Sequence, residues 1–213
     1  MAHAACHTFL LGDPPDYEPG PDASLAALAE RSGRSAIEVA LDAMLADGGR
    51  GLLYLPILNY SEGTSDPTRE MLLHPAAVLG LADGGAHVGT ICDASMPTWM
   101  LTHWVRDRAG ERLPLELVVQ RQTSGTAALY GLGDRGCLAP GMVADVNVID
   151  LDRLRLHVPE VHADLPAGGR RILQRADGYV ATIKTGALTY LDGTATGELP
   201  GRLLRGARPA PAR

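Results

Sequence analysis

Gly51-Leu-Leu-Tyr-Leu-Pro-Ile-Leu58 is a continuous apolar run that is bounded by glycine and asparagine and is too short for a typical helix. This pattern is typical of a strand buried on both faces. The sequence then predicts a helix from Asp66-Pro67 to His74-Pro75, followed by a second short apolar run, Ala77-Val-Leu-Gly-Leu81. The order strand, helix, strand indicates a parallel sheet, whose functional side chains lie at the carboxyl ends of the strands.

Two helices are predicted upstream of these runs, after a proline-rich loop at residues 12–22. The first covers Ser24 to Arg31. The second begins at Ser35, where Ser35 and Glu38 fit a capping box, and ends at Gly48-Gly49. Apolar residues recur in it with helical period and predict a buried face, formed by Ile37, Ala40, Leu41, Met44 and Leu45.

Three further helices are predicted downstream, and after them the sequence becomes mostly β. The helices run from Ser95 to about Arg106, from Leu113-Pro114 to Gln122, and from a Thr123 cap to Tyr130-Gly131. The predicted strands are rich in β-branched residues, as in Val146–Ile149 and Tyr179–Ile183. Thr185-Gly186 predicts a hairpin turn, and residues 202–213 are expected to form a loose tail.

The composition excludes several classes of protein. A chain of 213 residues with 46% hydrophobic content can bury a sizeable core. The net charge is −6, and acidic and basic residues are interspersed along the chain, so the sequence provides no basic face for nucleic acid or for an anionic membrane surface. The sequence has no apolar run of roughly 20 residues and no recognisable signal peptide, so a cytoplasmic location is expected.

The candidate site residues follow the two predicted strands. Asn59 and Tyr60 come after the first strand, and Asp83 and His87 come after the second. Asp83 stands between an apolar run and two glycines, which places a carboxylate at the mouth of a parallel sheet. Asp-Gly is also a common turn signal, so a purely structural turn is the alternative interpretation.

The sequence contains further residues with metal-binding side chains near its amino terminus. His3, Cys6 and His7 could bind zinc, and the two histidines could share one ion if the segment were helical. No helix signal is present there, so a metal site is not expected at these residues.

Four segments together resemble the amidohydrolases of the N-acyl-D-amino-acid deacylase type. Gly80-Leu-Ala-Asp-Gly-Gly-Ala-His-Val-Gly-Thr90 resembles the segment that closes their barrel, and Leu11–Pro19, Arg121–Ser124 and Gly136–Asp150 are similar to other parts of these proteins. The resemblance extends from about Thr8 to Gly206. It implies that residues 1–131 are the last β/α units of a TIM-type barrel, that residues 132–206 form a small β-sandwich domain, and that residues 207–213 are a tail.

The resemblance also implies a reaction. These enzymes hydrolyse the carbon–nitrogen bond of a small N-acyl amino acid with zinc as cofactor. Asp83 matches the aspartate that lies beside the metal as a catalytic acid and base and is a candidate ligand. His87, Asn59 and Tyr60 are substrate-pocket candidates by position. A general base of this kind contributes about 10²–10⁴-fold in rate.

The chain also departs from the family pattern. A complete barrel takes roughly 250 residues, whereas 82 residues precede Asp83 and no His-x-His is present. Because a catalytic zinc usually has three protein ligands, this chain alone is not expected to hold one. We therefore expect an incomplete C-terminal fragment, which would associate with the missing N-terminal barrel portion or with itself. The alternative is a non-enzymatic truncated remnant or partner subunit.

Overall fold

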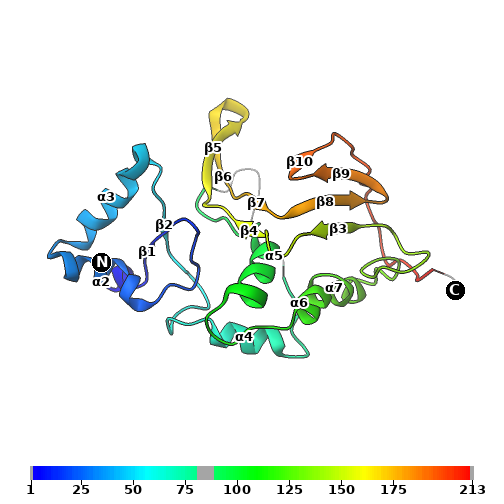
Figure 1. Cartoon of the computed structure of the whole chain (residues 1–213), viewed down its shortest axis with the longest axis horizontal. Coiled ribbons are helices and arrows are strands. Elements are labelled where there is room, and N and C mark those ends of the chain that lie inside the picture. The colour runs from blue at the N-terminus through cyan, green and yellow to red at the C-terminus, as the bar shows by residue number, and fades with distance from the viewer. Residues whose placement is uncertain (1, 81–88, 212–213) are drawn as a thin grey trace. The chain divides into compact units, whose positions relative to one another are not determined.

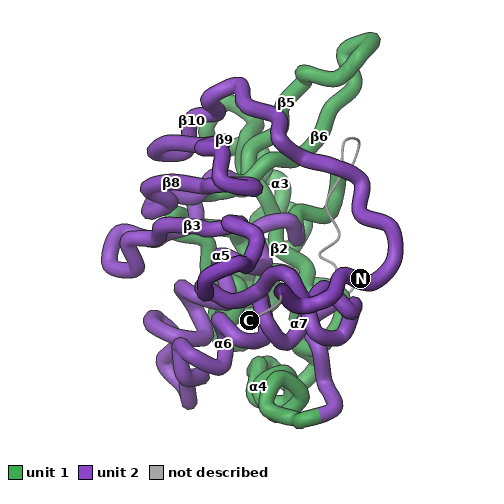
Figure 2. The backbone as a smooth tube through the Cα atoms, turned by 90° about the vertical axis from the view of Figure 1, so that its right-hand side faces the viewer, with its two compact units in different colours: residues 1–75, 85–92, 157–174 green, residues 76–84, 93–156, 175–213 purple. Residues whose placement is uncertain are grey.

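The computed structural model describes residues 2–80 and 89–211, which divide into two compact units (Figure 2). Unit 1 contains residues 2–75, 89–92 and 157–174, and unit 2 contains residues 76–80, 93–156 and 175–211. Among the described helices, none has both the length and the apolar character that crossing a membrane requires.

Three helices of unit 1 begin where the local sequence signals predict, namely α2 (Leu25–Ser32), α3 (Ala36–Gly49) and α4 (Asp66–Leu73). The unit also contains two short helices that were not predicted, α1 (Ala2–Cys6) and η1 (Pro21–Ala23). The Ser24 hydroxyl accepts a hydrogen bond from the backbone N–H of Ala27 at 3.3 Å and caps α2. At α3, Ser35 and Glu38 form both bonds of the predicted capping box. These caps satisfy backbone donors that have no partner inside the helix.

The apolar side of α3 is exposed, so the prediction of a buried face is wrong for this chain. Ile37 and Leu45 are 61% and 62% exposed, and Leu41 and Met44 are also exposed. Helical periodicity places apolar residues on one side of a helix, but it does not supply the surface that covers them.

The predicted strand at residues 51–58 forms only a short ladder, and its direction differs from the expectation. β2 (Leu53–Tyr54) pairs with β1 (Phe9–Leu10) in antiparallel register, with Phe9 opposite Tyr54. Leu55, Ile57 and Leu58 are exposed, and residues 77–80 form no strand. The predicted parallel pairing is therefore wrong for the described residues, because a short apolar run does not specify which segment it pairs with.

The helices of unit 2 confirm the predicted elements. α5 (Met96–Trp99) continues into the π-helix η2 (Met100–Asp107), and α6 (Leu115–Gln122) is followed by α7 (Ser124–Leu129). Trp104, Leu154 and Val118 are almost completely buried in this unit. Thr123 lies at the start of α7, but its hydroxyl donates to the Val119 carbonyl at 2.6 Å and does not cap that helix.

The carboxyl-terminal part of the chain is mostly β, as predicted (Figure 1). In unit 2, β3 (Val146–Ile149), β8 (Tyr179–Lys184), β9 (Ala187–Leu191) and β10 (Thr194–Ala195) form an antiparallel sheet in the order β10-β9-β8-β3. The predicted turn at Thr185-Gly186 joins β8 to β9, and both residues have positive φ. The same unit pairs β4 (Arg155–Leu156) with β7 (Ala176–Asp177).

Unit 1 contains a separate hairpin of β5 (Glu160–Leu165) and β6 (Gly169–Leu173), with the short helix η3 (Pro166–Gly168) at its tip. The described residues thus form a mixture of helices and sheets, as predicted, and the sheets are open. The barrel portion, the β-sandwich and the boundaries at residues 131 and 206 stay predictions.

The segment that was expected to be a loose tail has a defined position over its described residues. Leu132 and Arg208 form a parallel β-bridge, with the Gly133 N–H donating to Arg208 O at 2.8 Å and the Arg208 N–H donating to Gly131 O at 2.7 Å. Within unit 2, Arg208 therefore lies beside the residues that follow α7.

Candidate functional site

Two of the four predicted site residues, Asp83 and His87, lie outside the described residues, and their roles stay predictions. The described segment before them is held by a long-range contact inside unit 2. The Arg121 guanidinium donates a hydrogen bond to the Ala77 carbonyl. Arg121 belongs to one of the segments that resemble the deacylases, and this contact gives it a structural role.

The other two, Asn59 and Tyr60, lie in unit 1 after β2. Asn59 has a φ of 63° and is exposed, because residues 55–59 run through a loop outside any helix or strand. The Tyr60 side chain is 5% exposed, and its hydroxyl donates to the Pro19 carbonyl at 2.7 Å. Tyr60 also meets Phe9 edge to face, with 6.4 Å between ring centroids. The structure therefore gives Tyr60 a place in the core of unit 1.

The proline-rich loop at residues 12–22 fixes the segment that carries Asn59 and Tyr60. The Tyr17 carbonyl accepts a hydrogen bond from the Tyr54 hydroxyl at 3.3 Å, and the Glu18 carboxylate accepts one from the backbone N–H of Ser65 at 2.8 Å. Together with the Tyr60–Pro19 bond, these contacts join the loop to both ends of residues 54–65. The sequence signal was the pair Tyr17-Glu18 among prolines, but its partners could not be read from the sequence.

Gln174 connects the same loop to the β5–β6 hairpin of unit 1. Its amide nitrogen donates to the Tyr17 hydroxyl at 2.8 Å and to the His157 carbonyl at 2.7 Å. The Tyr17 and Tyr54 rings also meet edge to face, at 5.2 Å between centroids. Three distant segments of the chain are thereby joined by neutral hydrogen bonds and ring contacts.

Unit 2 contains a cavity of about 790 Å³ between its helices and its sheet. Its apolar wall includes Leu101, Val119, Val146 and Ile149, and its polar lining includes amide side chains and two carboxylates. The amides are those of Gln120, Gln122 and Asn147, and the carboxylates are those of Glu116 and Asp145. Such a lining suits the binding of an apolar group better than it suits proton transfer.

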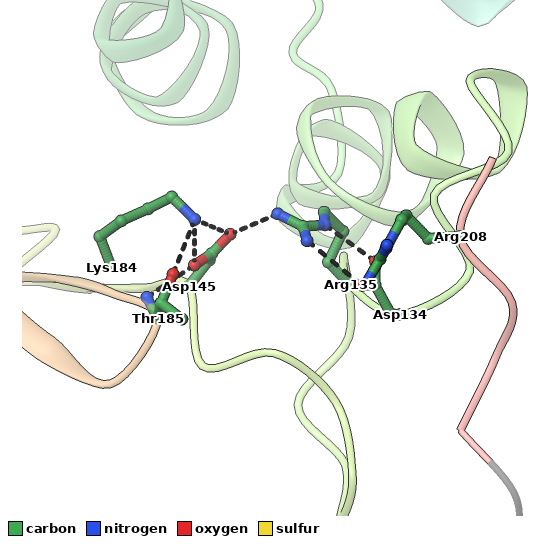
Figure 3. Close-up of polar contacts among 6 residues, drawn as sticks. All are labelled: Asp134, Arg135, Asp145, Lys184, Thr185 and Arg208. Atoms are coloured by element: carbon green, nitrogen blue, oxygen red, sulfur yellow. Dashed lines mark hydrogen bonds and ion pairs between the residues drawn. The ribbon is translucent and has the colours of Figure 1, made fainter. Parts of the chain in front are cut away.

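Asp145 is the central residue of a charged network in unit 2 (Figure 3). Its carboxylate accepts hydrogen bonds from Lys184 Nζ at 2.8 and 2.9 Å, from Arg135 at 3.0 Å and from the backbone N–H of Thr185 at 2.9 Å. Burial acts to raise the pKa of Asp145, but the bonds from Lys184 and Thr185 outweigh it and hold this pKa below its ordinary value.

Asp134 extends this network toward the carboxyl terminus. It accepts hydrogen bonds from Arg135 at 3.0 Å and from Arg208 at 3.3 Å, and the bond from Arg135 is the main reason that its pKa is lowered. Both carboxylates face cations that favour their charged forms, so they are poor proton acceptors. We assign the network a structural role, which was not predicted because it joins residues far apart in the sequence.

The described residues include no group of three or more His, Cys, Asp or Glu side chains that could hold a metal ion. His3 and Cys6 do lie in the short helix α1, contrary to the absence of a helix signal, and His7 follows its last residue. Cys6, Cys92 and Cys137 are not joined to one another by disulfide bonds. Within the described part of the chain, no side-chain cluster matches the geometry of a zinc site.

Comparisons with known proteins identify the family. A sequence model described as the amidohydrolase family matches residues 11–190. A comparison with curated proteins found no match. Three solved structures are similar to this chain, and all are structures of D-aminoacylase.

The first, a crystal structure that defines a subset of amidohydrolases, is 25% identical, with a TM-score of 0.49 over 92% of this chain and 37% of that chain. A variant in complex with copper chloride is 24% identical, with a TM-score of 0.51 over 94% and 38%. A structure from work on the binuclear metal centre is 25% identical, with a TM-score of 0.49 over 92% of this chain and 37% of that chain. The chain thus spans 37–38% of the length of these proteins. Because the family model covers most of the sequence, the chain belongs to the amidohydrolase family.

Proposed function

We propose that this chain provides the carboxyl-terminal part of an N-acyl-D-amino-acid deacylase, which hydrolyses the carbon–nitrogen bond of a small N-acyl amino acid. The observation that carries the proposal is the family match over residues 11–190, which includes the Gly80–Thr90 segment. The likeness in fold to a D-aminoacylase structure at a TM-score of 0.51 supports it.

In the proposed reaction, Asp83 transfers a proton. Its carboxylate accepts a proton from the water molecule whose oxygen bonds to the amide carbonyl carbon. Asp83 then returns that proton to the amide nitrogen as the carbon–nitrogen bond breaks. The products are a carboxylic acid and a free amino acid, so one water molecule is consumed in each turnover. Asn59 and His87 are proposed to lie near the substrate, whereas the buried Tyr60 belongs to the core of unit 1.

The metal of the proposed enzyme is not assigned to this chain. Zinc is the ion that we expect for the complete enzyme, and two of the similar D-aminoacylase structures are described with copper or with a binuclear metal centre. The described residues do not fit such an ion, because they form no cluster of metal-binding side chains. A catalytic zinc usually has three protein ligands, and we propose that further polypeptide provides them.

Exposed apolar surface in unit 1 supports association with further polypeptide. The apolar side of α3 and the loop at residues 55–58 expose leucine and isoleucine side chains, with Ile57 and Leu58 75% and 79% exposed. Apolar patches of this kind are typical of surfaces that another polypeptide covers. We propose that the covering polypeptide is the remaining part of the barrel, with self-association as the competing outcome.

Hydrolysis assays with and without the missing part test this proposal. We would assay the purified chain with added zinc on N-acetyl-D-methionine, and then the same chain co-expressed with the polypeptide encoded upstream. We expect no activity from the chain alone and activity from the pair, and Asp83→Asn should remove most turnover from the pair. Activity of the chain alone would contradict the fragment proposal. A metal-loaded, folded pair without activity would favour the non-enzymatic alternative.

A further inference from the structure

Three glycines of unit 2 form a surface on which the carboxyl-terminal segment lies. We call Gly131, Gly133 and Gly141 the glycine groove, and residues 207–211 the terminal segment. A Cβ atom added to Gly131 would lie 3.1 Å from the Ala207 Cβ, and one added to Gly141 would lie 3.0 Å from the Pro211 Cβ. The terminal segment approaches this closely because the groove has no side chains there.

Gly133 is the position of closest approach. An added Cβ would lie 2.9 Å from the Arg208 carbonyl oxygen and 3.0 Å from the Ala210 nitrogen. Both are backbone atoms, so no side-chain rotation would relieve the clash. Gly133 does not have a φ in the left-handed region, so its backbone would accept alanine in the absence of the terminal segment.

The groove binds the terminal segment through main-chain and side-chain contacts. The Arg208 N–H donates a hydrogen bond to the Gly131 carbonyl at 2.7 Å, and the Arg208 carbonyl accepts one from the Gly133 N–H at 2.8 Å. The Arg208 guanidinium donates to Asp134, whose side chain is 14% exposed (Figure 3). Main-chain pairing selects an extended backbone, and the half-buried carboxylate selects a cation at one position.

The proline that follows Arg208 suits this mode of binding. Pro209 has no N–H to leave unpaired and fixes φ near −65°, so the segment loses less conformational freedom when it binds. Pro211 repeats this property at the contact with Gly141. The two prolines of Arg208-Pro-Ala-Pro211 therefore favour an extended backbone even when the segment is not bound to the groove.

We propose that the glycine groove is a recognition site for an extended peptide with an Arg-Pro pair, and that the chain's own terminal segment occupies it. The contacts are few and Arg208 is 49% exposed, so binding in trans should be weak. Attachment to the same chain provides an effective concentration in the millimolar range, which explains occupation by the terminal segment. Displacement of that segment would make the groove available to the same segment of a second copy.

Hydrogen exchange in the intact chain tests the groove. We would measure exchange at the amides of Arg208 and Gly133 in the wild type and in the Gly133→Ala and Gly201→Ala variants. Gly201 is the matched control, because an added Cβ would meet nothing within 4 Å and its φ is not positive. We expect protected Arg208 exchange in the wild type and in Gly201→Ala, and at least a tenfold loss of protection in Gly133→Ala. An unprotected Arg208 in the wild type, or full protection in Gly133→Ala, would overturn the proposal.

Binding in trans tests recognition itself. In a full-length variant with residues 207–211 replaced by glycine and serine, a synthetic peptide of residues 205–213 should cause saturable amide shifts at Gly131 and Gly133 at millimolar concentration. The same peptide with Arg208→Ala should bind at least threefold more weakly, and Gly133→Ala in the protein should abolish the shifts. The amide spectrum also reports whether the variant is folded. A folded variant that shows no shifts would refute recognition, while the exchange experiment would still test docking within one chain.

Discussion

Lys184 Nζ lies 2.8 Å from Asp145 Oδ1 and 2.9 Å from Oδ2, although the two residues are 39 positions apart in the sequence. The contact joins the end of β8 to the segment that enters β3, and Arg135 approaches the same carboxylate at 3.0 Å. Asp145 therefore stabilises the start of the sheet by pairing with two cations and one backbone N–H.

Asp145→Asn should destabilise unit 2. The amide keeps an acceptor for the Thr185 N–H but loses the charge that faces Lys184 and Arg135. Because Lys184 is 39% exposed, solvent screening limits the loss to about 0.5–1.5 kcal/mol in the free energy of unfolding. Urea unfolding would measure it. Asp177→Asn, which breaks the more exposed pair with Arg155, is the control and should cost less. Equal losses would contradict the assigned role of Asp145.

The contribution of Asp145 should depend on pH. Its pKa is lower in the folded chain than in the unfolded chain, so its stabilising effect is present above the unfolded value of about 4. The effect is lost as the pH falls through the lower, folded pKa. The difference in unfolding midpoint between the wild type and Asp145→Asn should therefore narrow from pH 6 toward pH 3. A constant difference over this range would show that the charge of Asp145 is not the cause.

Tyr60→Phe should weaken unit 1 without changing its apolar packing. The variant removes the hydroxyl that donates to Pro19 O at 2.7 Å in a buried position. We expect a loss of about 1–2 kcal/mol in the free energy of unfolding, because the carbonyl is left without this donor. Tyr130→Phe is the control, since Tyr130 is 70% exposed. If Tyr60→Phe were as stable as this control, the Tyr60–Pro19 hydrogen bond would not contribute to the stability of unit 1.

Leu45→Gln on α3 should reduce association of the chain with itself while leaving its free energy of unfolding within about 0.5 kcal/mol of the wild type. Leu45 is 62% exposed, so the folded chain does not depend on its burial. Sedimentation at several protein concentrations would measure association, with Leu199→Gln as the control at a 92% exposed position. If Leu45→Gln and Leu199→Gln reduced association equally, α3 would have no specific role in it.

The ends of most helices could be predicted, because the deciding interactions lie within a few residues. Ser35 and Glu38 cap α3 through bonds between positions three apart, and Thr185-Gly186 sets the β8–β9 turn through its own backbone conformation. The family could also be recognised from the sequence, since segments such as Gly80–Thr90 and Gly136–Asp150 resemble it directly and the family match includes them.

The surroundings of the predicted site residues could not be obtained from local sequence patterns. Asn59 and Tyr60 were expected at the end of a parallel strand, whereas Tyr60 packs against Phe9 and bonds to Pro19. Those partners are more than 40 positions away, and no local pattern identifies them. Asp83 and His87 lie outside the described residues, so their roles stay predictions.

The sequence alone thus determined the family, the starts of the longer helices and the β8–β9 hairpin of this protein, because these follow from local backbone chemistry and from directly readable motifs. The tertiary structure decided the antiparallel pairing of β1 with β2, the exposure of α3, the network around Asp145 and the docking of Arg208 beside Gly133. Each of these depends on which distant segments meet in space. Periodicity and propensity describe one segment at a time and do not specify its partner.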